Sequence, residues 1–192
     1  MTEKEKAELG MLYDNNYDKE RVAERMACQC KCHEYNLLVP DETEKREKLI
    51  REIIPDIGDG FVIEQPFHCN LTYNIYIGKC FYSNYNLTIL NDGKVTIGDY
   101  VLIGPNCGIY TAGHPINARQ RNAGLEYAKP ITIGSHVWIG GGVQILPGVT
   151  IGSNVVIGSG SVVTRDIPDG VIAVGNPCRV IREIAEEDWE IV

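Results

Sequence analysis

The 192-residue sequence lacks an excess of positive charge and lacks any long apolar segment. Lysine and arginine together number 18 against 26 acidic residues, so the formal net charge is −8, which argues against general nucleic-acid binding. The first ten residues alternate charges and hold no apolar core of a secretory signal. A hydrophobic content of 44% still suffices for a packed core. We therefore expect a cytoplasmic protein that binds neither nucleic acid nor membrane.

Charge is also missing from one internal stretch. The 35 residues 130–164 contain no Asp, Glu, Lys or Arg, which raises the question of a membrane span. Eight of them are glycine and two are proline, with polar residues throughout, so no run of about 20 apolar residues exists. The absence of charge needs another cause.

The cysteines do not form a disulfide pattern. There are seven, an odd number, and three of them crowd together at Cys28, Cys30 and Cys32, next to His33. On a helix Cys28 and Cys32 share a face while Cys30 points roughly the opposite way. Zinc sites more often use Cys-x₂-Cys pairs, so we favour incidental reduced thiols over a zinc site and expect no metal.

A six-residue repeat is the strongest pattern in the sequence. Every sixth residue of one series is β-branched, and glycine usually follows it: Ile133, Ile139, Ile145, Ile151, Ile157 and Val163. The same phase occurs at Ile97, Ile103 and Ile109, and less regularly from Leu71 to Ile89. A helix cannot keep such a repeat on one face, because each repeat turns it by a net of about 240°. Short strands joined by tight turns can, and three hexads then form one coil with the aliphatic side chains pointing inward and glycine relieving the corner.

The repeat divides the chain into three parts. Residues 1–55 carry helical patterns and should form two or three small helices, including one over residues 42–51. Residues 56–178 form the coil of hexads, interrupted by an excursion at residues 110–130. Residues 179–192 form a tail, in which Arg179 to Trp189 has the composition of a short charged helix.

His114 is the best candidate for chemistry. Of four histidines it alone lies in the excursion, between Gly113 and Pro115, which would fix the backbone on both sides of the imidazole. A neutral imidazole accepts a proton near pH 7, as a general base must. A metal-dependent lyase built on His68, His114 and His136 is disfavoured by their spacing.

Four further segments are typical of a known protein family: 81–86 (FYSNYN), 111–115 (TAGHP), 131–140 (ITIGSHVWIG) and 174–177 (VGNP). Together they resemble the maltose and galactoside O-acetyltransferases, over nearly the whole chain. The resemblance implies a mainly β fold, a left-handed parallel β-helix with a small N-terminal helical segment and a short C-terminal helix. It also implies a homotrimer with an active site in each cleft between neighbouring subunits.

The resemblance further implies direct acetyl transfer from acetyl-CoA to a sugar hydroxyl. His114 would take the proton of that hydroxyl, and Asn84 would hold the acceptor and the transition state. The amide of Gly141 would stabilise the oxyanion. The other coenzyme contacts implied are Trp138 for the pantetheine arm and, near the phosphates, Ser159, Thr164, Arg165, Arg179 and Arg182.

On the acceptor side the resemblance points to Asn70, Asp92 and Glu126, and to either Asp14 or Asn15. Asn70 stands where relatives have Asp or Ser, so the sugar is open, although Glu126 is closer to the maltose branch. The alternatives are a xenobiotic or antibiotic acetyltransferase of the same superfamily and a non-catalytic hexapeptide scaffold.

Overall fold

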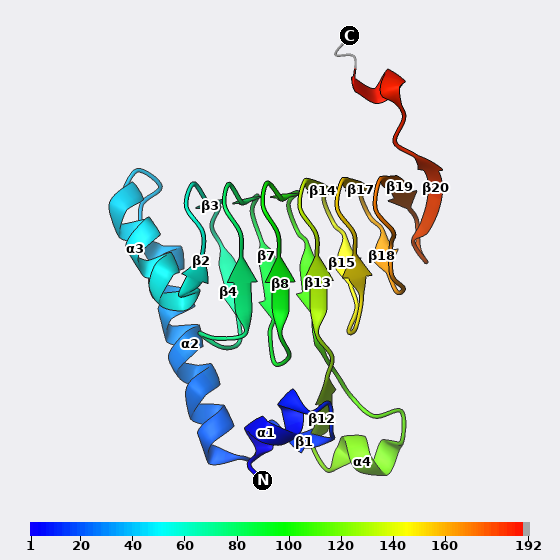
Figure 1. The fold of residues 1–192 in the computed structure, drawn as a ribbon. Helices are drawn as coiled ribbons and strands as arrows, with labels where there is room; N and C mark the ends of the chain where they lie inside the picture. Colours follow the sequence, from blue (N-terminus) through cyan, green and yellow to red (C-terminus); the bar gives the residue numbers. More distant parts are fainter. Residues whose placement is uncertain (190–192) are drawn as a thin grey trace.

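The computed structural model describes residues 1–189 and shows a parallel β-helix with helices at one end (Figure 1). Its coils stack so that each contributes one strand to each of three walls. The first wall contains β2 (Asp56–Ile57), β5 (Ile75–Ile77), β8 (Val95–Ile97), β13 (Ile131–Ile133) and β16 (Thr150–Ile151). The second contains β3 (Val62–Ile63), β6 (Tyr82–Ser83), β9 (Leu102–Ile103), β14 (Val137–Ile139), β17 (Val155–Ile157), β19 (Val171–Val174) and β20 (Arg179–Glu183). The third contains β4 (Phe67–Cys69), β7 (Leu87–Leu90), β10 (Gly108–Tyr110), β15 (Gln144–Ile145) and β18 (Val162–Val163).

The hexad aliphatics form the core, as expected from the repeat. Ile133, Ile139 and Ile145, one from each wall, are each 1% exposed. Successive coils place like residues in register, as where Ile97 pairs with Ile133 and Ile133 with Ile151. Stacked walls with paired backbones and an aliphatic interior explain the uncharged stretch.

The hexad glycines serve close packing between coils. A Cβ at Gly98 would lie 2.8 Å from the carbonyl carbon of Gly134, and one at Gly134 would lie 2.7 Å from that of Gly152. Neither glycine has a positive φ, whereas Asn154 and other residues near the corners do. The expectation that these glycines relieve the corner conformation is therefore wrong, because what they provide is room for the neighbouring coil.

Two helices cover the first coil. The N-terminal part contains α1 (Glu3–Glu8), β1 (Tyr13–Asp14), α2 (Lys19–Leu37) and α3 (Thr43–Ile53). Asp18 caps α2 by accepting a hydrogen bond from the amide of Arg21. Tyr35 of α2 and Ile50 of α3 are each 1% exposed and join the core of the β-helix. The two helices thus shield the end of the apolar interior from water (Figure 1).

The excursion packs against the N-terminus rather than extending into solvent. It contains β11 (Ala112–Gly113), α4 (Ala118–Asn122) and β12 (Leu125–Ala128). Strand β12 pairs antiparallel with both β1 and β11 in a three-stranded sheet. The sheet lies at one side of the β-helix (Figure 1) and brings residues 13–14 beside residues 125–126.

The C-terminal segment differs from the expected helix. Residues 179–183 form β20, which pairs antiparallel with β19, and only the single 3₁₀ turn η1 (Glu186–Trp189) is helical. Val180 and Ile181 favour the extended form, and Val180 pairs with Ala173 of β19. Residues 190–192 of the expected tail lie outside the described part. Within residues 1–189, no helix combines the length and the apolar character needed to cross a membrane.

Candidate functional site

A cavity of about 500 Å³ lies where the third wall turns into the first, an edge that we call the third–first edge. The excursion, the N-terminal sheet and α2 enclose it. Four of the six residues expected to contact the acceptor line it together with His114: Asn15, Asn70, Asp92 and Glu126. Asn16, Arg25, Leu90, Tyr110, Leu146 and Pro147 are among the other lining residues.

Asp92 is the buried centre of this polar network. Its Oδ1 accepts hydrogen bonds from Arg21 at 3.1 Å and from Asn15 at 3.1 Å, and its Oδ2 accepts one from Asn70 at 2.8 Å. The side chains of Arg21 and Asp92 are only 2% and 1% exposed. A buried ion pair needs such additional hydrogen bonds to offset its desolvation. Asp92 therefore holds Asn15 and Asn70 in place.

Glu126 forms the second acidic centre. The Nδ2 of Asn15 donates to its Oε2 at 3.0 Å, and the Nδ2 of Asn16 donates to its Oε1 at 3.3 Å. The Tyr13 hydroxyl lies 3.4 Å from the same Oε2. Burial, together with the charges of Asp92 and Glu126, raises the pKa of Tyr13 well above its ordinary value, so this hydroxyl stays a hydrogen-bond donor.

His114 stands at the mouth of the cavity, with 52% of its side chain exposed. Its Nδ1 lies 3.3 Å from the carbonyl oxygen of Leu125. A carbonyl oxygen can only accept, so this contact favours the neutral tautomer with its hydrogen on Nδ1, in which the lone pair of Nε2 is free. Nε2 lies 4.0 Å from the Glu126 carboxylate, which would stabilise a proton received there. The arrangement suits an imidazole that removes a proton from a bound hydroxyl.

The structure separates the two N-terminal candidates. Asn15 lines the cavity and is 4% exposed. The Asp14 carboxylate instead accepts hydrogen bonds from the amides of Asn16 and Tyr17 and is absent from the lining. The Asp14 side chain thus shapes the turn, and a contact of Asp14 with the acceptor stays a prediction.

Asn84 and Gly141 lie at another edge, between the second and third walls, which we call the second–third edge. Asn84 follows β6, and Gly141 follows β14 two coils further on. Ser159 lies on the next coil, where Gly160 donates its amide to the carbonyl of Gly141. The Gly141 amide donates no hydrogen bond to any described residue. Strand β7 separates this edge from His114 within one chain, so one chain alone does not bring Asn84 and His114 together.

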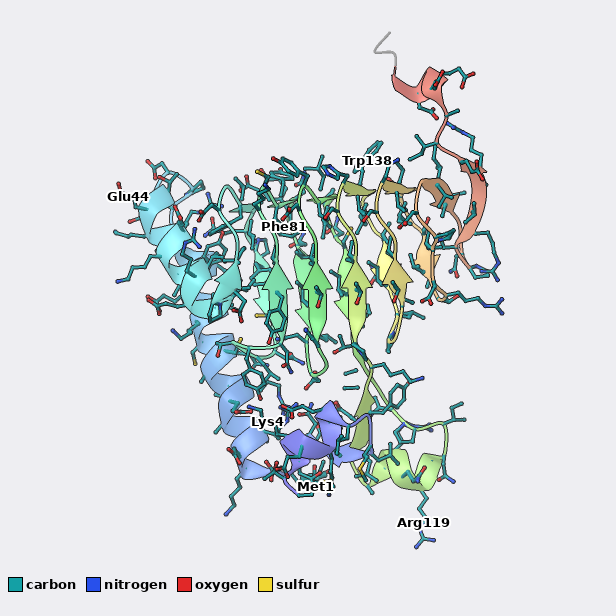
Figure 2. The ribbon with its side chains drawn as sticks, in the orientation of Figure 1. Met1, Lys4, Glu44, Phe81, Arg119 and Trp138 are labelled. Atoms are coloured by element: carbon teal, nitrogen blue, oxygen red, sulfur yellow. The ribbon has the colours of Figure 1, made fainter. Side chains whose placement is uncertain are left out.

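Trp138 lies on the outer face of the second wall, 57% exposed. It pairs in register with Leu102 and Val156. Figure 2 places it on the side of the β-helix opposite Lys4 and Arg119, and therefore away from the cavity. The outward residues of this wall form an apolar row that we call the apolar ladder: Val62, Tyr82, Leu102, Trp138, Val156 and Ile172.

The other two walls are mainly polar outside. The corresponding row of the first wall contains Asp56, Tyr76, Thr96, Thr132 and Thr150, and that of the third contains His68, Thr88, Gly108, Gln144 and Val162. A continuous exposed apolar row, such as the one on the second wall, is typical of an interaction surface.

The basic residues expected near the coenzyme phosphates are spread apart. Thr164 and Arg165 are exposed at the third–first edge, on the coil beyond Leu146 and Pro147. Arg179 begins β20, where its guanidinium donates to the carbonyl of Cys178 at 2.7 Å. Arg182 is paired with Asp188 through two hydrogen bonds of 2.6 Å, which raises the pKa of Arg182 and lowers that of Asp188. A phosphate at Arg182 would have to compete with Asp188.

Three residues that shape the site were missed by sequence reasoning. Arg21 holds Asp92, and Arg25 donates to the carbonyl of Asn15 at 3.0 Å. Asn91, which is fully buried, accepts from the amides of Asn70 and Leu71 and so fixes the loop that carries Asn70. Nothing in the local sequence distinguishes Arg21 or Arg25 from the other charged residues of α2. Asn91 does lie at an interruption of the repeat, because the step from Ile89 to Ile97 is eight residues instead of six.

Family models match three parts of the chain. Residues 6–58 match the maltose acetyltransferase hexapeptide capping motif. Residues 130–165 match the bacterial transferase hexapeptide with six repeats, and residues 94–116 match the hexapeptide repeat of succinyl-transferase. The first match covers the helices that close the β-helix, and the other two cover its coils.

The chain is also similar to proteins of known name. Galactoside O-acetyltransferase of Escherichia coli K12 is 50% identical over 156 residues, which cover 81% of this chain and 77% of the relative. A solved maltose O-acetyltransferase from Clostridium difficile 630 superposes with a TM-score of 0.94 at 50% identity, covering 97% of this chain and 99% of the other. A galactoside acetyltransferase solved in complex with coenzyme A gives a TM-score of 0.96 at 46% identity, covering 100% of this chain and 95% of the other.

Proposed function

This chain belongs to the hexapeptide-repeat family of maltose and galactoside O-acetyltransferases, and from that premise we propose that it transfers the acetyl group of acetyl-CoA to a hydroxyl of a sugar. It is an acetyl-CoA-dependent acyltransferase, in keeping with a relative that was solved with coenzyme A. The observation that carries the sugar proposal is the polar cavity beside His114. Its volume of about 500 Å³ is sufficient for a small sugar, and its amides and carboxylates suit a polyhydroxylated ligand.

His114 acts as the general base in this proposal. The Leu125 carbonyl holds the ring with Nε2 free, and Nε2 takes the proton as the sugar oxygen attacks the thioester carbon. The carbonyl electrons move to oxygen, and the unused amide of Gly141 supports donation to that oxyanion. The tetrahedral species then expels the coenzyme thiolate, which takes the proton back from the imidazolium. The products are an acetyl ester and free coenzyme A, with no acetyl-enzyme.

The acceptor is held by the amides that the two acidic centres orient. Asn15 and Asn70 present their side chains to the cavity while each donates to Asp92. Glu126 has its carboxylate between the Asn15 and Asn16 amides and His114. Asp92 acts mainly as a positioning residue, because three donors already occupy its oxygens.

The working unit in this proposal is a homotrimer with the coenzyme between neighbours. His114 and Arg165 lie at the third–first edge, while Asn84, Gly141 and Ser159 lie at the second–third edge. The four residues of β7 span about 13 Å at roughly 3.3 Å each, so one chain keeps the two edges apart. A second copy can place its second–third edge opposite His114. A closed ring of three such contacts would also cover part of the apolar ladder.

Thiol release from acetyl-CoA tests the proposal. The purified protein is assayed with glucose, maltose, galactosides, amino sugars, serine and chloramphenicol as acceptors. We expect release with a sugar, and we expect His114→Ala to lower kcat at least about a hundredfold while the molecular mass in solution stays the same. His136→Asn is the matched control, because His136 lies on the β-helix at φ 58°, which asparagine tolerates.

Three results would contradict the proposal. An unchanged rate in His114→Ala would refute the role of His114 as general base. Release with chloramphenicol alone would point to a xenobiotic acetyltransferase. Failure to bind coenzyme A would point to a non-catalytic scaffold.

A further inference from the structure

Three buried thiols meet where α2 packs on the first coil. Cys28 and Cys32 lie one turn apart on the inner face of α2, and Cys69 ends β4. They are 0%, 2% and 3% exposed. Cys30, which the sequence grouped with them, is exposed on the other side of the helix, and the distant Cys69 takes its place.

The sulfur positions match a set of metal ligands. The Sγ of Cys69 lies 3.5 Å from that of Cys28 and 3.8 Å from that of Cys32, and all three lie within 4.8 Å of one another. Thiolates bound tetrahedrally to zinc at about 2.3 Å lie about 3.8 Å apart, as the geometry of a tetrahedron requires. Two of the three sulfur–sulfur distances are thus close to those on one face of such a tetrahedron, and the third is at most 4.8 Å.

A second cavity, of about 220 Å³, opens onto this face. Cys32 and Cys69 line it together with His33 and His68. The cavity provides a route for an ion to the sulfurs. It also leaves the fourth position of a tetrahedral ion to a water molecule.

The surroundings can carry the charge of such a site. Three thiolates around a divalent cation leave a net charge of −1, and the positive charge of Lys31 acts on Cys28 in the direction that favours a thiolate.

We propose that Cys28, Cys32 and Cys69 bind one thiophilic d¹⁰ cation of the class of Zn²⁺ and Cd²⁺. On binding, each thiol still protonated releases its proton to solvent and a metal–sulfur bond forms, with no change in oxidation state. The ion ties α2 to β4 directly beside Asn70, a residue that lines both cavities. It is independent of the acetyl transfer, because none of the three thiols lines the cavity beside His114.

Cadmium titration of the reduced, full-length protein tests the site. We expect one Cd²⁺ per chain with a thiolate-to-cadmium charge-transfer band in the ultraviolet, and we expect Zn²⁺ to compete for the site and to raise Tm. Cys32→Ala and Cys69→Ala should lower the affinity at least about a hundredfold and abolish the Tm increase. Cys30→Ser is the matched control, since it removes a thiol of the same helix, and it should bind as the unchanged protein does.

Other outcomes would overturn the proposal. These are an absence of stoichiometric Cd²⁺ binding, an equal loss in Cys30→Ser, or a Cys28–Cys69 disulfide found by mass spectrometry as the only reaction of the cluster. If circular dichroism shows that the alanine variants do not fold, Co²⁺ binding to the unchanged protein and to Cys30→Ser tests the site instead. Intense sulfur-to-cobalt charge-transfer bands together with tetrahedral d–d bands support the site, and their absence refutes it.

Discussion

Replacing Asp92 with asparagine tests whether the buried ion pair organises the acceptor cavity. The carboxylate receives Arg21 and Asn15 on one oxygen and Asn70 on the other. An asparagine side chain has one oxygen and one NH₂, so whichever way it turns, its NH₂ faces at least one of these donors. The substitution removes the charge and also breaks the network.

The expected loss of stability depends on the hydrogen-bond and ion-pair partners that Arg21 retains in the variant. Its guanidinium keeps the Tyr73 hydroxyl at 2.9 Å and Glu24 at 3.6 Å, but Glu24 is 28% exposed and is a weaker partner. Breaking a buried ion pair costs about 3–5 kcal/mol, and the remaining partners place this case near 3 kcal/mol. For a domain of this size that corresponds to a fall in Tm of about 6–12 °C. Because Asn15 and Asn70 lose their orientation, KM for the acceptor should rise more than KM for acetyl-CoA.

Urea denaturation, thermal melting and initial rates measure these effects. Asp59→Asn is the matched control: Asp59 lies 2.9 Å from Arg51, but its side chain is 96% exposed. An exposed pair contributes less than about 1 kcal/mol, so this variant should stay close to the unchanged protein in stability and rate. If Asp92→Asn loses no more stability than Asp59→Asn, or if its acceptor KM is unchanged, the network does not organise the cavity.

Three further predictions concern other parts of the molecule. Burial raises the pKa of Tyr13, so above about pH 10 the unfolded chain loses this proton while the folded chain keeps it, and stability falls with rising pH by up to about 1.4 kcal/mol per unit. Tyr13→Phe should make that fall less steep in urea denaturation between about pH 9 and 11, and an unchanged slope would count against the assignment. Arg179→Ala should raise KM for acetyl-CoA more than it lowers kcat in steady-state kinetics, whereas a loss confined to kcat would exclude a binding role. Leu102→Glu, in the middle of the apolar ladder, should reduce the mass measured by light scattering from that of the proposed trimer to that of a monomer. Thr132→Glu on the first wall should leave the mass unchanged. If neither variant changes the mass, the apolar ladder is not part of the interface.

The core of the β-helix could be read from the sequence with few errors. The six hexad residues from Ile133 to Val163 point inward and are buried, as the phase of the repeat indicated: Ile133, Ile139, Ile145, Ile151, Ile157 and Val163. The same phase held even where the residue is polar, since Ser83 is fully buried in β6. Short strands depend on side chains that alternate within a few residues, so local sequence is sufficient to specify them. The C-terminal segment was misjudged because the same charged residues fit a helix or a strand, and pairing with β19 decides between them.

The candidate site was predictable only in part. His114 stood out by its place in the excursion, and the resemblance identified Asn15, Asn70, Asp92 and Glu126 as possible neighbours. The choice of Asn15 over Asp14 needed the pairing of β1 with β12, which turns one side chain into the cavity and the other into a local turn. The handedness expected for the coils also came from the resemblance, since parallel connections are ordinarily right-handed.

The sequence by itself determined the repeat, the inward residues, the excursion and its histidine, because each is a property of residues close together along the chain. The tertiary structure alone decided which distant residues meet. Asn15 reaches across 77 positions to Asp92 and across 111 to Glu126, and Cys28 across 41 to Cys69. Such contacts depend on how coils stack and on where the capping helices and the excursion dock. Those arrangements are set by packing of whole elements, which no local pattern encodes.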